Sequence, residues 1–259
     1  MDGISTFGTG RRRRWAVVMV ALGLAVVSAC SNSSDSGSSD AGSSQRTSPS
    51  AAPPPDCAQP SDQVKDLELD RGATETTLRM GSGPRGVVLA PQSDGDVCQW
   101  VPFGRRLVGM GYHVITFGPW SQPYAPQVDQ AAAELRQSGA TRIVLIGASQ
   151  GGTMVLGRAA HQRPQAAGVI SLSGETKADD STDAIAEIKR YSGPLLLLGS
   201  ENDIYVMSTG TRAIAAAHPG SETVVIFPGY AHGVEFLTGP ESSRTITEMD
   251  TFLRKALPA

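Results

Sequence analysis

Residues 142–154 read RIVLIGASQGGTM and place Ser149 in a G-x-S-x-G pattern, between Gly147 and Gly151. The apolar residues before the serine are typical of a buried strand, and the residues after the glycines have helical character. A strand that turns sharply into a helix at a serine crowds the positions two before and two after it, so small residues are needed there. The pattern therefore predicts a strained turn that presents the Ser149 hydroxyl. A serine that only caps the helix would give the same local pattern.

A serine hydroxyl needs a base before it can act as a nucleophile, and His232 is the histidine that the sequence favours for this role. It lies in FPGYAHGVEF, directly after a buried strand pattern, and Ala231 and Gly233 leave it room to approach Ser149. A surface histidine without a catalytic role is the alternative. The other three histidines lie in a strand pattern, in a helix pattern and at a helix end, respectively: His113, His161 and His218.

A carboxylate must hold that histidine in the correct tautomer, and Asp203 is the preferred candidate. It lies in LLLLGSENDIYV, just beyond a buried strand pattern, while Glu201 and Glu175 also follow strand patterns and are the alternatives. The carboxyl ends of parallel strands meet at one edge of a sheet, where ligands bind. The chain order Ser149, Asp203, His232 is the order expected in an α/β-hydrolase.

The transition state of acyl transfer carries a negative oxygen, which preorganised backbone N–H groups must stabilise. One N–H is expected from Gln150, directly after the nucleophile. The second is expected from the loop after the strand pattern at Gly86–Pro91. Because Pro91 has no N–H, Gln92 is the preferred donor of this oxyanion hole and Ser93 is the next candidate.

The folded region alternates strand and helix patterns, which predicts an α/β fold with a mostly parallel central sheet and helices on both faces. Two segments alternate polar and apolar residues, as antiparallel strands with one exposed face do, namely Val64–Leu69 and Thr74–Met80. Continuous apolar runs are typical of strands buried on both faces, and they occupy Gly86–Pro91, Tyr112–Phe117, Arg142–Gly147, Gly168–Leu172, Pro194–Gly199 and Thr223–Phe227. Helical patterns occupy Val101–Met110, Pro126–Ser138, Thr153–His161, Asp183–Tyr191, Ser208–His218 and Ser243–Leu257.

Four segments carry a resemblance to a known family: VVLAPQSDGDVCQWVPFGRRLVGMGYHVITFG (87–118), GASQGG (147–152), GSENDIYV (199–206) and GYAHG (229–233). They resemble dienelactone-hydrolase-like serine hydrolases of the α/β-hydrolase superfamily, and the similarity covers about residues 65 to 257. The resemblance implies the α/β-hydrolase fold and a serine mechanism. Two segments depart from it: LAPQ stands where many relatives carry His-Gly, and TFGPWSQ lacks an aspartate that often follows the fourth buried strand.

Little or no cap domain is predicted above the site. Many relatives insert a cap after the strand that ends near Leu172, whereas only about twenty residues separate this strand from the one that begins near Pro194. We therefore expect an open site with Trp100, Trp120 and Tyr124 as candidate wall residues. Small or accessible esters are the expected substrates.

These residues predict a serine hydrolase that cleaves carboxylic esters through an acyl-enzyme. A peptidase or a thioesterase would use the same triad, and a binding lipoprotein that keeps a hydrolase fold without turnover is the alternative from another class. The sequence contains neither an H-E-x-x-H motif nor a P-loop, so no metal and no other cofactor is expected.

The first sixty residues differ from the remainder. Arg11–Arg14 precede an apolar run, Trp15–Ala29, that is too short to span a bilayer comfortably, which favours a secretory signal peptide over residues 1–29. Val27-Ser28-Ala29-Cys30 resembles a bacterial lipoprotein box, which implies lipidation of Cys30, and the Ser/Gly/Pro-rich residues 30–59 are expected to be a tether to a domain at 60–259. The resemblance implies an exported protein, anchored by lipid on the extracytoplasmic face of the cell membrane. An ordinary signal peptide or an uncleaved anchor is the alternative.

Charge and cysteine content restrict the partners and the compartment. The formal charge is −3, and without the residues before Cys30 it is about −6, which disfavours nucleic acid as a partner. Cys57 and Cys98 remain once Cys30 is assigned to lipidation, and in an oxidising compartment they would form one disulfide. Two buried thiols are the alternative.

Overall fold

The computed structural model describes residues 53–68, 74–118, 120, 125–178 and 182–259, which belong to one compact unit, Ala51–Ala259. The predicted signal peptide, Cys30, most of the tether and Tyr124 lie outside the described residues. No helix in the described part of the chain is long and apolar enough to cross a membrane.

The main sheet of the described residues has eight strands and is mostly parallel, as predicted. The strands are β1 (Gln63–Glu68), β2 (Thr74–Met80), β3 (Arg85–Ala90), β4 (His113–Phe117), β5 (Arg142–Ala148), β6 (Gly168–Leu172), β9 (Leu195–Ser200) and β10 (Glu222–Phe227). Their order across the sheet is β1-β2-β4-β3-β5-β6-β9-β10. β2 pairs antiparallel with both β1 and β4, and all other neighbours are parallel. The loops after the parallel strands therefore meet at one edge.

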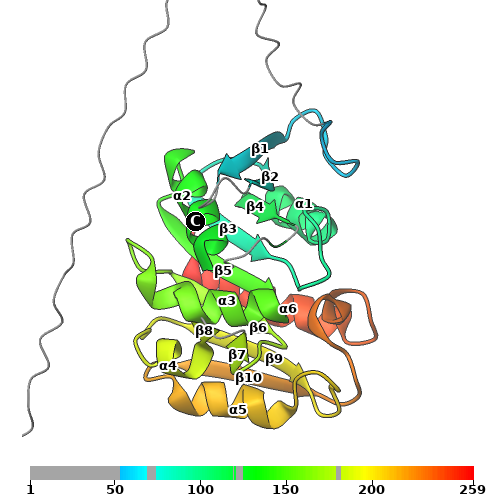
Figure 1. Ribbon diagram of the computed structural model, residues 1–259, viewed down its shortest axis with the longest axis vertical. Helices are drawn as coiled ribbons and strands as arrows, with labels where there is room; N and C mark the ends of the chain where they lie inside the picture. Colours follow the sequence, from blue (N-terminus) through cyan, green and yellow to red (C-terminus); the bar gives the residue numbers. More distant parts are fainter. Residues whose placement is uncertain (1–52, 69–73, 119, 121–124, 179–181) are drawn as a thin grey trace, which may run out of the picture. The chain divides into compact units, whose positions relative to one another are not determined.

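Helices cover both faces of the sheet, as Figure 1 shows for α3 and α6. One face carries α1 (Val101–Gly109) and α6 (Ser242–Ala256), and the other carries α2 (Ala125–Gln137), α3 (Gln150–Arg158), α4 (Ala184–Ile188) and α5 (Ser208–Ala217). In β3, Val87 and Leu89 belong to the first core, whereas Val88 and Ala90 belong to the second. This two-sided burial explains the continuous apolar runs in the sequence.

α3 begins at Gln150 rather than at the predicted Thr153. The sequence suggests that Gly151 and Gly152 precede the helix, but both lie inside its first turn and are buried. A Cβ atom on Gly151 would lie 2.4 Å from the carbonyl oxygens of Ala90 and Pro91. Gly151 is therefore needed for close packing of the helix start against the end of β3 and the loop after it, whereas a Cβ atom on Gly152 would lie 2.7 Å from Ser171 Oγ.

Between β6 and β9 the described residues form a small hairpin, β7 (Lys177–Ala178) with β8 (Thr182–Asp183), followed by the short α4. The predicted helix Asp183–Tyr191 is shorter in the structure at both ends: Asp183 is its N-cap and accepts a hydrogen bond from the Ala186 N–H, and Lys189 is its C-cap. Short connections of this kind leave the carboxyl edge of the sheet without a large cap.

The predicted disulfide is confirmed. Cys57 and Cys98 are bonded with their Cα atoms 5.7 Å apart, which ties the chain ahead of β1 to the loop ahead of α1. Arg105 of α1 adds an ion pair with Asp62 and donates to the Cys57 carbonyl oxygen. The start of the folded unit is thus fixed to α1 by covalent and ionic contacts.

His113 is buried in β4 between two polar partners. Its Nε2 atom lies 3.1 Å from Arg79 Nη1, and its Nδ1 atom lies 3.3 Å from the Gly83 carbonyl oxygen. Because a guanidinium only donates, Nε2 accepts and Nδ1 carries the hydrogen. Burial lowers the pKa of His113 and the charge of Arg79 lowers it further, although the hydrogen bond to Gly83 opposes both effects.

We expect acid to destabilise the fold through His113. Its folded-state pKa lies below the unfolded value, so the unfolded chain binds the proton better and the free energy of unfolding falls as pH decreases below about 6.5. His113→Gln keeps an acceptor for Arg79 but does not titrate, so its free energy of unfolding should fall less between about pH 7.5 and about pH 5.5. His218, whose pKa burial also lowers, is present in both proteins. Urea unfolding measures the difference, and equal decreases would contradict the assignment.

Candidate active site

Ser149 occupies the turn between β5 and α3 with φ 50° and ψ −118°, a conformation that L-residues rarely adopt. Its N–H donates to the Leu172 carbonyl oxygen of β6 at 2.8 Å, which holds the turn against the neighbouring strand. A Cβ atom on Gly147 would lie 2.2 Å from the Gly151 carbonyl oxygen. The predicted strained turn is therefore confirmed, and the two glycines are sterically required by it.

Asp203 and His232 are hydrogen-bonded at the carboxyl ends of β9 and β10. His232 Nδ1 donates to Asp203 Oδ2 at 2.8 Å, because a carboxylate only accepts. Asp203 Oδ1 accepts from the N–H groups of Tyr205 at 2.9 Å and Val206 at 3.1 Å. Both oxygens of this buried carboxylate are thus engaged, and the proton on Nδ1 leaves Nε2 of His232 free to accept another.

Three further contacts fix the loop that carries His232. Ser200 Oγ donates to the Ala231 carbonyl oxygen at 2.7 Å, which joins the end of β9 to this loop. The His232 N–H donates to Glu235 Oε2 at 2.9 Å, at the start of a short 3₁₀ helix, η3 (Gly233–Leu237). The ring of Tyr205 packs against the imidazole with 4.8 Å between centroids. The ring and the backbone of His232 are therefore both restrained.

Ser149 and His232 line one cavity of about 330 Å³, here named the catalytic cavity after the roles predicted for these two residues. Its remaining lining residues are Gln92, Ser93, Asp94, Glu175, Tyr205 and Glu235. No hydrogen bond joins Ser149 to His232 within the described residues, and such contacts are often long in enzymes without substrate. The fold nevertheless brings the nucleophile and the base of the predicted triad to the same hollow.

The two alternative acids do not bond to His232. Glu201 is exposed, and its N–H donates to the Phe227 carbonyl oxygen at 2.9 Å. Glu175 lines the catalytic cavity and is exposed, yet desolvation raises the pKa of its carboxyl group; the nearby His232 opposes this shift and Asp203 adds to it. Asp203 remains the residue whose geometry fits the orienting acid.

The loop after β3 differs from the expectation for the oxyanion hole. The Gln92 N–H, predicted as a donor, already donates to Gln99 Oε1 at 3.0 Å. The Ser93 N–H makes no hydrogen bond with the described part of the chain, and Ser93 lines the catalytic cavity. Gln150 lies at the first position of α3, where N–H groups have no partner within the helix. The N–H groups of Gln150 and Ser93 are thus available to bind an oxyanion, whereas the N–H group of Gln92 becomes available only if the Gln99 side chain moves.

Gln92 has another role, which the sequence did not indicate. Its side-chain Oε1 accepts from the Val234 N–H at 3.2 Å, two residues beyond His232, and its Nε2 donates to Asp94 Oδ1 at 2.8 Å. A Cβ atom on Gly233 would lie 2.4 Å from Gln92 Oε1. The β3 loop therefore packs directly against the loop of the base. No local pattern reveals this contact, since it depends on a glycine 141 positions away in the chain.

Thr153 and Tyr205 are further site residues that sequence analysis missed. Thr153 Oγ1 donates to the Ser149 carbonyl oxygen at 3.2 Å and accepts from the Glu175 N–H at 2.8 Å. Tyr205 is 71% exposed at the rim of the catalytic cavity. Trp100, in contrast, is fully buried in the core and does not line the cavity. Trp120 is half-buried, and its Nε1 donates to the Pro91 carbonyl oxygen at 2.8 Å.

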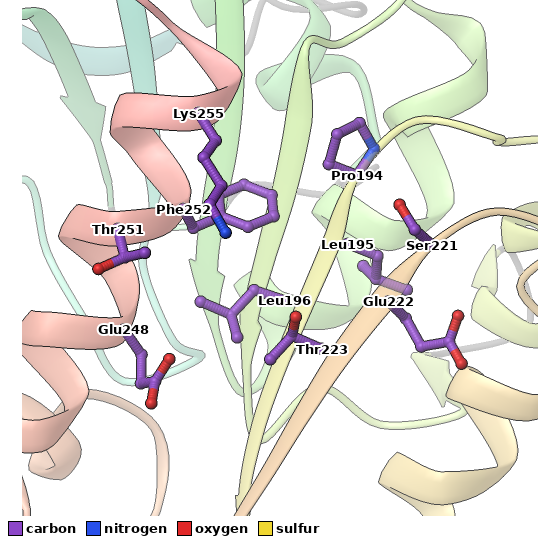
Figure 2. A pocket seen from close by; sticks show the side chains of 10 residues that line it. All are labelled: Pro194, Leu195, Leu196, Ser221, Glu222, Thr223, Glu248, Thr251, Phe252 and Lys255. Carbon is purple, nitrogen blue, oxygen red and sulfur yellow. The ribbon is translucent and has the colours of Figure 1, made fainter.

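A cavity of about 360 Å³ lies at the opposite end of the sheet (Figure 2). It lies between α6 and the amino ends of β9 and β10, and its walls include Leu195, Thr223 and Phe252. Although it is slightly larger, it contains none of the three triad residues. In the described residues no cluster of histidine, cysteine or acidic side chains suits a metal ion. The catalytic cavity is therefore the candidate active site.

Known proteins share this fold. The model of the Phospholipase/Carboxylesterase family matches residues 123–235, a range that contains Ser149, Asp203 and His232. An esterase of Thermogutta terrifontis with bound butyrate gives a TM-score of 0.63 at 17% identity, over 79% of this chain and 98% of that chain. The same esterase phosphonylated by sarin gives a TM-score of 0.61 at 16% identity, over 76% of this chain and 95% of that chain. No curated protein matches the sequence significantly.

A protein of Klebsiella pneumoniae subsp. pneumoniae, provisionally described as a dienelactone hydrolase, gives a TM-score of 0.58 at 15% identity, over 74% of this chain and 98% of that chain. These solved structures share the parallel sheet with helices on both faces. The chain therefore has the α/β-hydrolase fold.

Proposed function

We propose that this protein is a serine hydrolase that cleaves carboxylic esters through a covalent acyl-enzyme. The observation that carries the proposal is the hydrogen bond from His232 to the buried Asp203, in a cavity that also contains the strained Ser149. The description of the matching family and the esterase among the similar structures support ester hydrolysis. Peptidases and thioesterases use the same triad, and neither comparison favours them.

In the proposed mechanism each group has its own step. Ser149 Oγ attacks the carbonyl carbon while His232 Nε2 takes its proton, and N–H groups of Gln150 and of the β3 loop stabilise the oxyanion. As the tetrahedral intermediate collapses, His232 gives the proton to the departing alcohol. Water then attacks the acyl-enzyme with His232 again as the base, which releases the acid and restores Ser149. Asp203 orients His232 and stabilises the imidazolium throughout.

The charge of the catalytic cavity restricts the substrate. Asp94, Glu175 and Glu235 line it, and no lysine or arginine is among its described lining residues. Anionic esters would be repelled, whereas neutral or cationic esters would not. The absence of a large cap in the described chain between β6 and β9 fits small or accessible esters.

Single substitutions test the triad in hydrolysis of 4-nitrophenyl acetate and butyrate. Ser149→Ala should lower kcat by about 10⁴-fold or more, and Asp203→Asn by about 10⁴-fold, because the nucleophile or the correct histidine tautomer is lost. Glu175→Gln, a carboxylate in the same cavity without a bond to His232, is the matched control and should change kcat by less than about tenfold. If Glu175→Gln lowered kcat as much as Asp203→Asn, Glu175 would be the carboxylate that acts on His232. Undiminished turnover by Ser149→Ala would refute the mechanism.

We also propose that the protein is exported and lipid-anchored through Cys30. The arginines and apolar run before Cys30 support this proposal, and so does the disulfide, since such bonds persist in oxidising compartments. Two acyl chains of a diacylglyceryl group would give stable anchoring.

Detergent phase partition tests the anchor on the full chain produced in a bacterial host. The parent should enter the detergent phase as a chain that begins at Cys30, with the mass of the lipid added. Cys30→Ala should carry no such mass. A parent whose mature chain begins at another residue, or that lacks lipid, would exclude the lipoprotein proposal.

A further inference from the structure

A second hollow adjoins the catalytic cavity on the face covered by α1 and α6. It has a volume of about 280 Å³, and most of its lining side chains are apolar. Pro102 and Phe103 come from α1, Val234 and Leu237 from η3, and Ile246 from α6. We name it the apolar cavity.

The apolar cavity is not a binding site for anions, although an arginine lines it. Arg106 lies at its edge, but its guanidinium makes two hydrogen bonds with Asp250, of 2.7 Å and 2.5 Å. The positive charge is therefore already neutralised by a carboxylate. The other polar lining residues are Gln99, Glu235 and Thr238. Of these, Glu235 Oε2 already accepts from the His232 N–H at 2.9 Å. Hydrocarbon is the chemistry that the apolar residues of the wall fit.

The apolar and catalytic cavities share one wall. Glu235 lines both, and Val234, next to it, donates to Gln92 Oε1. Gln99 lines the apolar cavity, while its Oε1 accepts from the N–H of Gln92, which lines the catalytic cavity. Gln92, Gln99 and Glu235 thus form part of the boundary between the two cavities.

Glycines make this wall compact. A Cβ atom on Gly95 would lie 2.5 Å from Gln99 Oε1, so the Gln99 amide packs directly onto the backbone of the β3 loop. Hydrogen bonds to the side chains of Gln99 and Gln92 hold part of this wall. Rotation of one side chain, Gln99, would remove part of it and would also release the Gln92 N–H.

We propose that the apolar cavity receives the acyl chain of the ester, and that displacement of Gln99 by this chain opens the way. This inference rests on the proposed esterase function and names its substrate class: neutral esters with a medium-length hydrocarbon acyl group. The acyl group stays on Ser149 through the second step and gains from an enclosed site. The alcohol leaves beside His232, at the rim formed by Tyr205 and Glu175. The same rotation of Gln99 frees the Gln92 N–H for the oxyanion.

The volume sets the length of the chain. An apolar protein cavity of about 150 Å³ holds a benzene ring, so 280 Å³ admits an acyl chain of about six to eight carbons. Each methylene buried there should raise kcat/KM roughly two- to fourfold until the cavity is full.

Two tryptophan substitutions on α6 provide a matched pair. Ile246→Trp fills the apolar cavity, whereas Thr251→Trp fills the cavity at the amino ends of β9 and β10 (Figure 2). Both positions are half-buried and lie on the same helix. A general effect of tryptophan on the fold would therefore appear in both variants.

The experiment measures kcat/KM for 4-nitrophenyl acetate, butyrate, hexanoate and octanoate. We expect the parent and Thr251→Trp to prefer the longer esters. Ile246→Trp should lower kcat/KM for octanoate by about tenfold or more and for acetate by less than about twofold. Equal losses of kcat/KM on octanoate and acetate in Ile246→Trp, or a kcat/KM of the parent that does not depend on chain length, would overturn the inference. Turnover of the acetate ester would still support the proposed esterase function in that case.

A binding measurement separates the inference from catalysis. Octanamide is neutral, resembles the acyl product and needs no turnover, so its affinity can be measured by calorimetry against acetamide. The parent and Thr251→Trp should bind octanamide, and Ile246→Trp should bind it at least about tenfold more weakly. Equal affinity in the two variants, or no binding by the parent, would contradict an acyl site even if ester hydrolysis failed altogether.

Discussion

The backbone of Ser149 is the constraint on which the rest of the site depends. A non-glycine residue at φ 50° and ψ −118° has a conformational free energy about 1–3 kcal/mol above that of an unstrained residue, so the surrounding structure must hold it there. The hydrogen bond to Leu172 and the contact between Gly147 and Gly151 do so, and they require β5, β6 and α3 to be in place. The fold thus stabilises a turn that presents a hydroxyl at the carboxyl edge of the sheet.

Hydrogen bonds between loops complete the site around that turn. The loops after β9 and β10 are joined by the bond between Asp203 and His232 and by the bond from Ser200 to Ala231. Gln92 joins the loop after β3 to the loop of the base. His232 is therefore oriented by contacts from the loops after two other strands, so its proposed role depends on the order of the strands as much as on the residues themselves.

Most of the fold follows from local patterns in the sequence, because strands buried on both faces leave continuous apolar runs and the helices between them do not. The nucleophile, base and acid can be nominated because each follows a strand, and the two cysteines can be paired by elimination. The partner of the Gln92 N–H could not be predicted, since it is a side chain seven residues away that fits only because Gly95 lacks a Cβ atom. The β7–β8 hairpin has two residues in each strand, too few for periodicity, and the burial of Trp100 depends on how α1 packs.

The proposed mechanism requires that His232 activates Ser149, and a fluorophosphonate probe reports this activation because it bonds to an activated serine oxygen and expels fluoride. We expect one adduct per folded chain, which mass spectrometry should locate on the peptide that contains Ser149, and no adduct in Ser149→Ala or His232→Ala. A folded parent that stays unmodified, or an adduct on any other serine, would contradict it.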